Sequence, residues 1–282
     1  MRIGVALPAG IPGAEPDVVV QWAATADSGP FSHLALIDRI KYDNYEPFVV
    51  LSAAAAVTKR VRLATTVLIS TLRNTTVLAK QAASLDRLSS GRLVLGMGLG
   101  ARDDDYEVTG VERTSRGRRL SDQITEMRSV WEGKVIGPEP TNPGGPLILL
   151  GGSTGPALGR MARFADGYIH GGGPPRVFAR ATEQARAAWI DVGRPGRPEI
   201  WGQAYFALGD AVDKGRDYMR DYYAFTGPFA EKLAAGMLTT PQEIEEFVRG
   251  YEEGGCDELS LLPAVAELDQ LDRLAEVVGS LS

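Results

Sequence analysis

Short apolar runs alternate along this chain with longer segments in which apolar residues recur every three or four positions. The short runs are typical of β-strands. Most of them are continuously apolar, as expected of strands buried on both faces of a parallel sheet. The pattern predicts strands at residues 3–7, 33–37, 61–68, 93–97, 147–150, 167–170, 200–208 and 258–262.

The longer segments have the periodicity of amphipathic helices. The fourth is the clearest, because Leu120, Ile124, Met127 and Trp131 fall on one helix face. Eight alternating strand–helix pairs predict an α/β fold, a TIM (β/α)8 barrel, with loop insertions at 133–146 and 209–236. No shift in composition marks a second domain, so we expect residues 1–282 to form a single domain. The predicted helices span residues 18–27, 48–58, 77–88, 118–131, 157–164, 177–190, 241–251 and 268–278.

Composition and charge narrow the functional class. The chain has 282 residues and a net charge of −6, which argues against a nucleic-acid partner. No apolar run approaches the roughly 20 residues that span a bilayer. Because the first predicted strand begins almost at the first residue, we expect no signal peptide. Cys256 is the single cysteine, so an intrachain disulfide is excluded. We expect a cytoplasmic protein that binds neither membranes nor nucleic acid.

A glycine-rich loop follows the fifth predicted strand. Gly151, Gly152, Ser153 and Thr154 open a helical segment, and the free N–H groups at a helix N-terminus suit a phosphate. TIM barrels commonly bind phosphate late in the chain, at the carboxyl ends of their strands. A tight turn without a ligand is the alternative, and the two hydroxyl groups favour the phosphate.

A second glycine-rich segment, residues 96–101, formally fits the dinucleotide fingerprint G-x-G-x-x-G/A. Its context argues against a Rossmann fold, because Asp103, Asp104 and Asp105 follow at once and would repel a pyrophosphate. A better interpretation is a loop after the fourth barrel strand, where Gly98 and Gly100 let a flat ring approach the backbone. A loop that needs positive φ angles remains equally open.

Asp38 and Arg39 come at the end of the second predicted strand, where barrel enzymes place catalytic residues. Two interpretations stay open, a catalytic role and an ion pair that stiffens the rim. His33 and His170 are the two histidines, and neither an H-E-x-x-H nor a C-x-x-C motif occurs, so we expect no metal.

Several segments, in order along the first two thirds of the chain, resemble the bacterial luciferase-like family of flavin-dependent oxidoreductases. This family includes monooxygenases that use FMN and enzymes that use the deazaflavin coenzyme F-420. The segments are LIDR at 36–39, TTVLI at 65–69, KQAASLD at 80–86, SGRLVLGMG at 90–98 and ADGY at 165–168.

The resemblance implies a TIM barrel with the isoalloxazine ring over the carboxyl ends of the strands. It implies a cis peptide bond, not involving proline, between Thr66 and Val67, which would support the ring. The loop from Gly98 to Asp104 would flank the ring, and residues 151–154 would hold the phosphate. It also implies a homodimer, a small organic substrate and a separate flavin reductase as partners.

One departure from the family affects the chemistry. The deazaflavin dehydrogenases carry an Asp-His pair where this chain has Asp38 and Arg39. An arginine stays charged near neutral pH and cannot shuttle a proton, although it could bind an anionic substrate or stabilise an anionic reduced flavin. Alcohol oxidation is therefore not inferred.

We expect a flavin-dependent oxidoreductase, a luciferase-like monooxygenase using reduced FMN and dioxygen, or an enzyme using reduced F-420. Asp38 and Arg39 would face the substrate. Two alternatives remain. One is a barrel lyase or isomerase that binds a phosphorylated substrate and uses Lys41 or Lys80 as its base. The other is a non-catalytic flavin-binding subunit.

Overall fold

The computed structural model describes residues 1–133 and 136–281. Within them, eight parallel strands pair in chain order and close into a barrel, with the first strand hydrogen-bonded to the last. This is the α/β TIM barrel that the alternating pattern predicts. The strands are β1 (Arg2–Ala6), β2 (His33–Leu36), β3 (Arg62–Ile69), β4 (Leu93–Gly98), β5 (Leu147–Gly151), β6 (Gly167–Ile169), β7 (Glu199–Phe206) and β8 (Glu258–Pro263).

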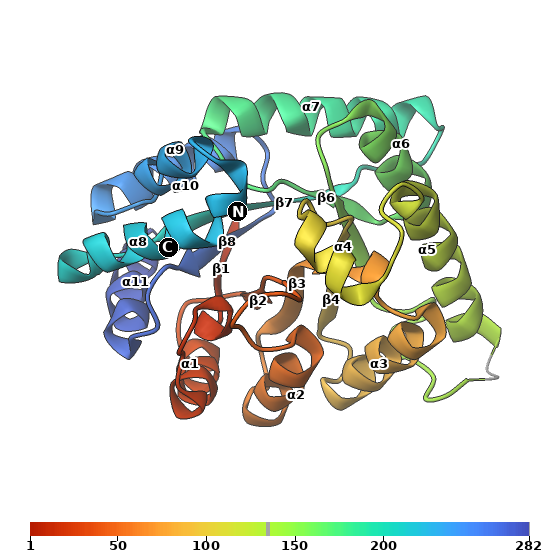
Figure 1. Ribbon diagram of the computed structural model, residues 1–282, viewed down its shortest axis with the longest axis horizontal. Coiled ribbons are helices and arrows are strands. Elements are labelled where there is room, and N and C mark those ends of the chain that lie inside the picture. Colours follow the sequence, from red (N-terminus) through yellow and green to blue (C-terminus); the bar gives the residue numbers. More distant parts are fainter. Residues whose placement is uncertain (134–135, 282) are drawn as a thin grey trace.

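The predicted helices surround the barrel and cover its outer face (Figure 1). Their apolar faces pack on the strands, and Leu120, Ile124, Met127 and Trp131 are buried as the spacing predicts. They are α1 (Pro16–Ser28), α2 (Pro47–Val57), α3 (Thr75–Leu88), α5 (Arg116–Gly133), α6 (Gly155–Phe164), α7 (Pro175–Asp191), α10 (Pro241–Glu253) and α11 (Leu268–Ser280).

The described residues form three further helices that were not predicted: α4 (Asp103–Thr109), α8 (Val212–Tyr222) and α9 (Phe229–Ala235). The insertion at 209–236 is therefore largely helical and not a loop. The acidic run that argued against a pyrophosphate forms the first turn of α4, where carboxylates suit the positive end of the helix dipole. Short 3-10 turns lie at η1 (Pro8–Gly10), η2 (Ser70–Leu72), η3 (Gly209–Ala211) and η4 (Ala224–Thr226).

The predicted insertion at 133–146 is irregular in its described part, and residues 134–135 lie outside the described residues. Asp86 at the end of α3 holds it to the barrel. The Asp86 carboxylate accepts a hydrogen bond of 2.7 Å from the backbone N–H of Thr141 and a weaker one from Asn142. This segment therefore packs beside α3.

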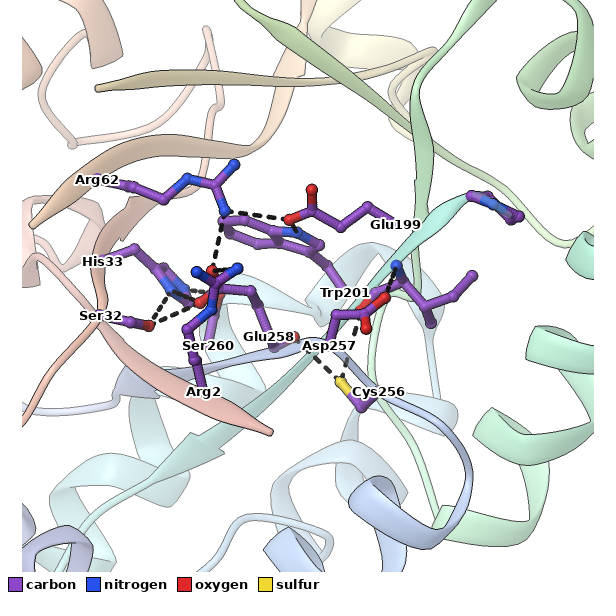
Figure 2. Close-up of polar contacts among 12 residues, drawn as sticks. Arg2, Ser32, His33, Arg62, Glu199, Trp201, Cys256, Asp257, Glu258 and Ser260 are labelled. Atoms are coloured by element: carbon purple, nitrogen blue, oxygen red, sulfur yellow. Dashed lines mark hydrogen bonds and ion pairs between the residues drawn. The ribbon is translucent and has the colours of Figure 1, made fainter. Parts of the chain in front are cut away.

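A charged network fills the amino-terminal end of the barrel interior (Figure 2). The fully buried Glu258 accepts hydrogen bonds from Ser32 Oγ at 2.6 Å and from His33 Nδ1 at 2.9 Å. It also forms ion pairs with Arg2 at 2.8 Å and Arg62 at 2.9 Å. These side chains close the end of the barrel at which the strands begin.

The protonation of this network follows from its contacts. Burial opposes the charge of Glu258, but the hydrogen bonds from His33 and Ser32 and the nearby Arg2 lower its pKa to about 2. Burial lowers the pKa of His33, and this effect is larger than the opposite effect of the Glu258 carboxylate. A neutral imidazole therefore donates from Nδ1 to a charged carboxylate, while Nε2 accepts from the Ser260 hydroxyl at 2.7 Å.

Candidate functional site

At the carboxyl-terminal end of the barrel interior, one layer combines two small residues with two polar ones. Trp201 faces the interior, because its ring lies 4.5 Å from the His33 ring and packs with Ala64 and Leu149. Successive side chains of a strand alternate between its two faces. The next interior positions are therefore Thr66 on β3, Gly151 on β5 and Gln203 on β7. On β1, Gly4 faces His33, so Ala6 takes the corresponding position in the same layer.

The end of β3 forms the floor of this region. The peptide bond between Thr66 and Val67 is cis, which confirms what the resemblance implies. The pairing of β3 with β4 changes register between Thr65 and Leu68. As a result Val67, next to the inward-facing Thr66, also packs with the interior cluster.

The position of the Val67 side chain explains why residue 98 is a glycine. A Cβ at Gly98 would lie 2.6 Å from Val67 Cγ2, so no larger residue fits there without a shift. A Cβ at Gly151 would make ordinary van der Waals contacts, the nearest at 3.6 Å to the Ile169 carbonyl oxygen, so a methyl group would fit there without a shift. Gly100 has φ +72°, which confirms the expectation of a positive φ angle in this loop.

The glycine-rich loop after β5 opens to solvent on the same rim. Gly151 ends β5, and residues 152–155 are exposed. Thr154 is the N-cap of α6, and its hydroxyl accepts a hydrogen bond of 3.4 Å from the backbone N–H of Ala157. The Ser153 hydroxyl has no partner among residues 1–133 and 136–281. This helix N-terminus is therefore accessible to an anion.

Asp38 is buried in an ion pair, but its partner is not its neighbour Arg39. Its carboxylate pairs with Arg73 at 2.7 Å and accepts a hydrogen bond of 2.8 Å from the backbone N–H of Ile69. Burial raises the pKa of Asp38, and the Arg73 charge and the Ile69 amide act against this rise. The interpretation as a rim ion pair therefore describes the geometry, with Asp38 tying the end of β2 to the end of β3.

Arg39 lies with the predicted site residue Asp104. Its guanidinium donates to Asp104 Oδ2 at 3.2 Å, and only 8% of its side chain is exposed. It also lies over the ring of Tyr42, 4.5 Å from the centroid, and 5.7 Å from the ring centroid of Tyr222. The structure thus joins the loops after β2 and β4 at one side of the barrel mouth.

A group of tyrosines that the sequence analysis missed covers the mouth. Tyr218 and Tyr222 of α8 are buried, and the Tyr218 hydroxyl donates to the Gly10 carbonyl at 3.2 Å. The hydroxyls of Tyr223 and Tyr205 are 3.3 Å apart. Burial raises the pKa of all four, so the hydroxyls stay protonated. Tyr218 and Tyr222 are four residues apart, a spacing that places both side chains on one face of a helix and could have predicted α8.

Arg102 fastens this cover to the loop after β4. Its guanidinium lies 4.5 Å from the ring centroid of Tyr222 and 4.2 Å from that of Phe225. It also donates to the Tyr222 carbonyl at 2.9 Å. A small cavity beneath the cover is lined by Ile37, Tyr205, Tyr218 and Leu262, among others.

His170 lies outside the mouth of the barrel. It follows the inward-facing Ile169, and its ring packs on Phe178 of α7 with 5.7 Å between centroids. Its Nδ1 lies 3.2 Å from the Tyr168 hydroxyl, and burial lowers its pKa. The described residues contain no group of three or more His, Cys, Asp or Glu side chains that could hold a metal. In the same residues, no helix is long and apolar enough to cross a membrane.

Solved structures share this fold. An F420-dependent secondary alcohol dehydrogenase in complex with an F420-acetone adduct superposes with a TM-score of 0.84 at 15% identity, covering 100% of this chain and 99% of that one. The monooxygenase RslO1 from Streptomyces bottropensis gives 0.78 at 19% identity, covering 99% and 98%. The oxygenating constituent of 3,6-diketocamphane monooxygenase from Pseudomonas putida, in complex with FMN, gives 0.71 at 15% identity, covering 93% and 91%.

Curated relatives are more similar in sequence over part of their length. An uncharacterized protein of Mycobacterium tuberculosis is 35% identical over 169 residues, which cover 55% of this chain and 58% of the relative. The phthiodiolone/phenolphthiodiolone dimycocerosates ketoreductase of Mycobacterium tuberculosis is 33% identical over 180 residues, covering 62% of this chain and 45% of that protein. The chain thus spans about three fifths or less of the length of these relatives.

A family model settles the relationship. The model described as luciferase-like monooxygenase matches residues 1–254, which include every strand up to β7 and the whole candidate site except the end of β8. The structure agrees with this match, because it has the barrel and the cis peptide bond at Thr66 that the resemblance implies. The chain therefore belongs to the luciferase-like monooxygenase family.

Proposed function

We propose that this protein is a flavin-dependent oxidoreductase that binds FMN or F-420 at the carboxyl-terminal mouth of its barrel. One observation carries the proposal: the accessible N-terminus of α6 lies on the same rim as the interior positions around Gly151. Val67, Gly151 and Gln203 face the interior and are partly exposed, so solvent reaches the floor of the mouth. A phosphate and a planar ring joined by a short chain fit such a pair of adjoining sites.

Each part of the site has a role in this proposal. Gly152, Ser153 and Thr154 hold the phosphate through backbone N–H groups and hydroxyls. The ring lies over Thr66 and Val67, with the loop from Gly98 to Asp104 at its edge. The bound cofactor supplies the electron transfer, and the protein supplies orientation and excludes water.

Arg39 and Asp38 have different roles. Arg39 stays charged and is held by Asp104 at 3.2 Å, so it can bind an anionic group of the substrate or of the reduced ring. Asp38 acts through Arg73 and the Ile69 amide, which makes it a positioning residue for the end of β3.

The lyase or isomerase alternative finds no support in the position of its lysines. Lys41 and Lys80 are exposed. The Lys80 ammonium donates to the Gly137 carbonyl at 2.9 Å, on the outside of the barrel. A base that forms a Schiff base or abstracts a proton must reach the interior.

A titration of cofactor-free protein with FMN and with F-420, followed by fluorescence, tests the proposed function. A Ser153→Asp variant places a carboxylate at the α6 N-terminus, where it would repel the phosphate. We expect affinity for the bound cofactor to fall about tenfold or more, which corresponds to 1.4 kcal/mol or more.

The control is Ser129→Asp, the same change at an exposed position of α5. It should leave the affinity unchanged. If the wild-type protein binds neither cofactor, the proposal fails. If it binds one of them, a turnover assay in which a reductase supplies the reduced cofactor distinguishes an enzyme from a non-catalytic flavin-binding subunit.

A further inference from the structure

Gln203 is a polar residue on the interior face of β7, between two aromatic residues. Its neighbours on the same face are Trp201 and Tyr205, and both are buried. Its Oε1 atom is buried, and neither end of its carboxamide has a side-chain hydrogen bond to any described residue. A buried polar atom without a partner costs about 1–3 kcal/mol, so it needs an explanation.

Thr66 shows the same feature on the opposite wall. Its side chain is 2% exposed, and its hydroxyl oxygen has no partner in the described part of the chain. β3 and β7 are four strands apart in a barrel of eight, so they face each other across the interior. Thr66 and Gln203 share their layer with Ala6 and Gly151, so two unpaired polar groups face the interior in one layer with two small residues.

The chemistry of a carboxamide defines what it can bind. It presents an acceptor oxygen and a donor N–H side by side. Its complement is an edge with a donor N–H beside a carbonyl, as in an imide. Flavin and deazaflavin rings both carry this edge, with N3–H between the C2 and C4 carbonyls.

We propose that Gln203 binds the imide edge of the flavin or deazaflavin ring. This inference rests on the proposed function and adds a ring contact on β7 that the phosphate loop and the β3 floor do not supply. The layer that holds Gln203 is the one directly beside the glycine-rich loop, because Gly151 belongs to both. The unpaired Nε2 of His170 does not belong to this layer, because its ring packs against α7, outside the strands.

The test compares FMN with 3-methyl-FMN, in which a methyl group replaces the N3 proton. For the wild-type protein we expect about tenfold weaker binding of the methylated analogue, as lost pairing at one site implies. Gln203→Met keeps the side-chain length but removes donor and acceptor. It should bind FMN about tenfold more weakly and no longer distinguish the two ligands.

Two further variants complete the test, one as an alternative substitution at residue 203 and one as a control elsewhere. Gln203→Glu keeps acceptor oxygens but loses the donor, so it covers the case in which the Met variant does not fold. Its oxygens can still accept from N3–H, so it should keep discrimination against the methylated ring but bind FMN more weakly, because the hydrogen bond to the ring carbonyl is lost. Gln184→Leu changes an exposed glutamine of α7 and should behave as the wild type.

The possible failures are distinguishable. If the wild-type protein binds FMN and the Gln203 variants keep both affinity and discrimination, the inference is wrong while the proposed function stands. If the wild-type protein binds only F-420, the variants are compared by their affinity for F-420, and equal affinity overturns the inference. If it binds neither cofactor, the proposed function fails and the inference falls with it.

Discussion

Two residues, His33 and Glu258, make the stability of the barrel depend on pH. His33 is neutral in the folded protein because burial lowers its pKa. Glu258 is charged, with a pKa lowered to about 2. In both cases the unfolded chain takes up protons at a higher pH than the folded chain, so stability falls on acidification. The loss due to His33 begins near its unfolded pKa of about 6.5, and that due to Glu258 runs from about 4.5 down to about 2.

A His33→Gln variant separates the two contributions. In urea unfolding between pH 7 and pH 5, we expect the wild-type free energy of unfolding to fall by up to about 1.4 kcal/mol per pH unit for each buried histidine. The variant should be less stable at pH 7 but show a shallower fall.

His33 and His170 are the two histidines of the chain. The double variant His33→Gln, His170→Gln should therefore no longer lose stability between pH 7 and pH 5, since the raised pKa of Asp38 acts in the opposite direction. An undiminished slope in the single variant would show that His33 is protonated in the folded protein.

At the scale of elements, the mouth of the barrel is assembled from segments far apart in the chain. Arg39 after β2 meets Asp104 of α4, and Arg102 beside it lies between two rings of the segment after β7. The loops of this end therefore hold one another in place. Their contacts are made by side chains, while the strands beneath are fixed by the backbone ladder.

The sequence predicts the elements better than their contacts. All eight strands and their following helices lie where the apolar pattern predicts them, because burial on a barrel wall leaves a strong periodic signal. Helix α4 was missed because its acidic start was interpreted as electrostatic repulsion, although it also favours a helix N-terminus. The partner of Asp38 could not be predicted, because Arg73 comes from a turn whose direction depends on the whole barrel.

The cover formed by α8, η4 and α9 should loosen independently of the barrel. Tyr222 contacts Tyr42, Arg102 and Tyr218, so Tyr222→Leu removes several of its attachments at once. We expect amide hydrogen exchange in residues 212–235 to become roughly tenfold faster, for a loss of about 1 to 2 kcal/mol.

Exchange in the strands should stay unchanged in this variant. Phe229→Leu, at an exposed position of α9, serves as the control and should alter neither region. Faster exchange throughout the barrel would mean that the cover and the barrel unfold as one unit.

At the scale of the whole molecule, self-association remains a prediction from the family resemblance. A groove between α2 and α3 carries the exposed apolar side chains Val49, Val77 and Leu88. If this face joins two copies, Val77→Glu should shift the sedimentation coefficient from dimer to monomer, because a buried unpaired charge is costly.

Val177→Glu, at a half-exposed position of α7, is the matched control. It should leave the sedimentation coefficient unchanged. A wild-type protein that sediments as a monomer at all concentrations would contradict the prediction.

The charged network fills the amino-terminal end of the barrel, which leaves the carboxyl-terminal mouth as the end from which a ligand would enter. If the ring binds against the floor at Val67, as we propose, it would have to bind before the substrate, and the product would have to leave before it. The shape of the barrel would then set the order of binding and release, and both would pass the tyrosines of α8.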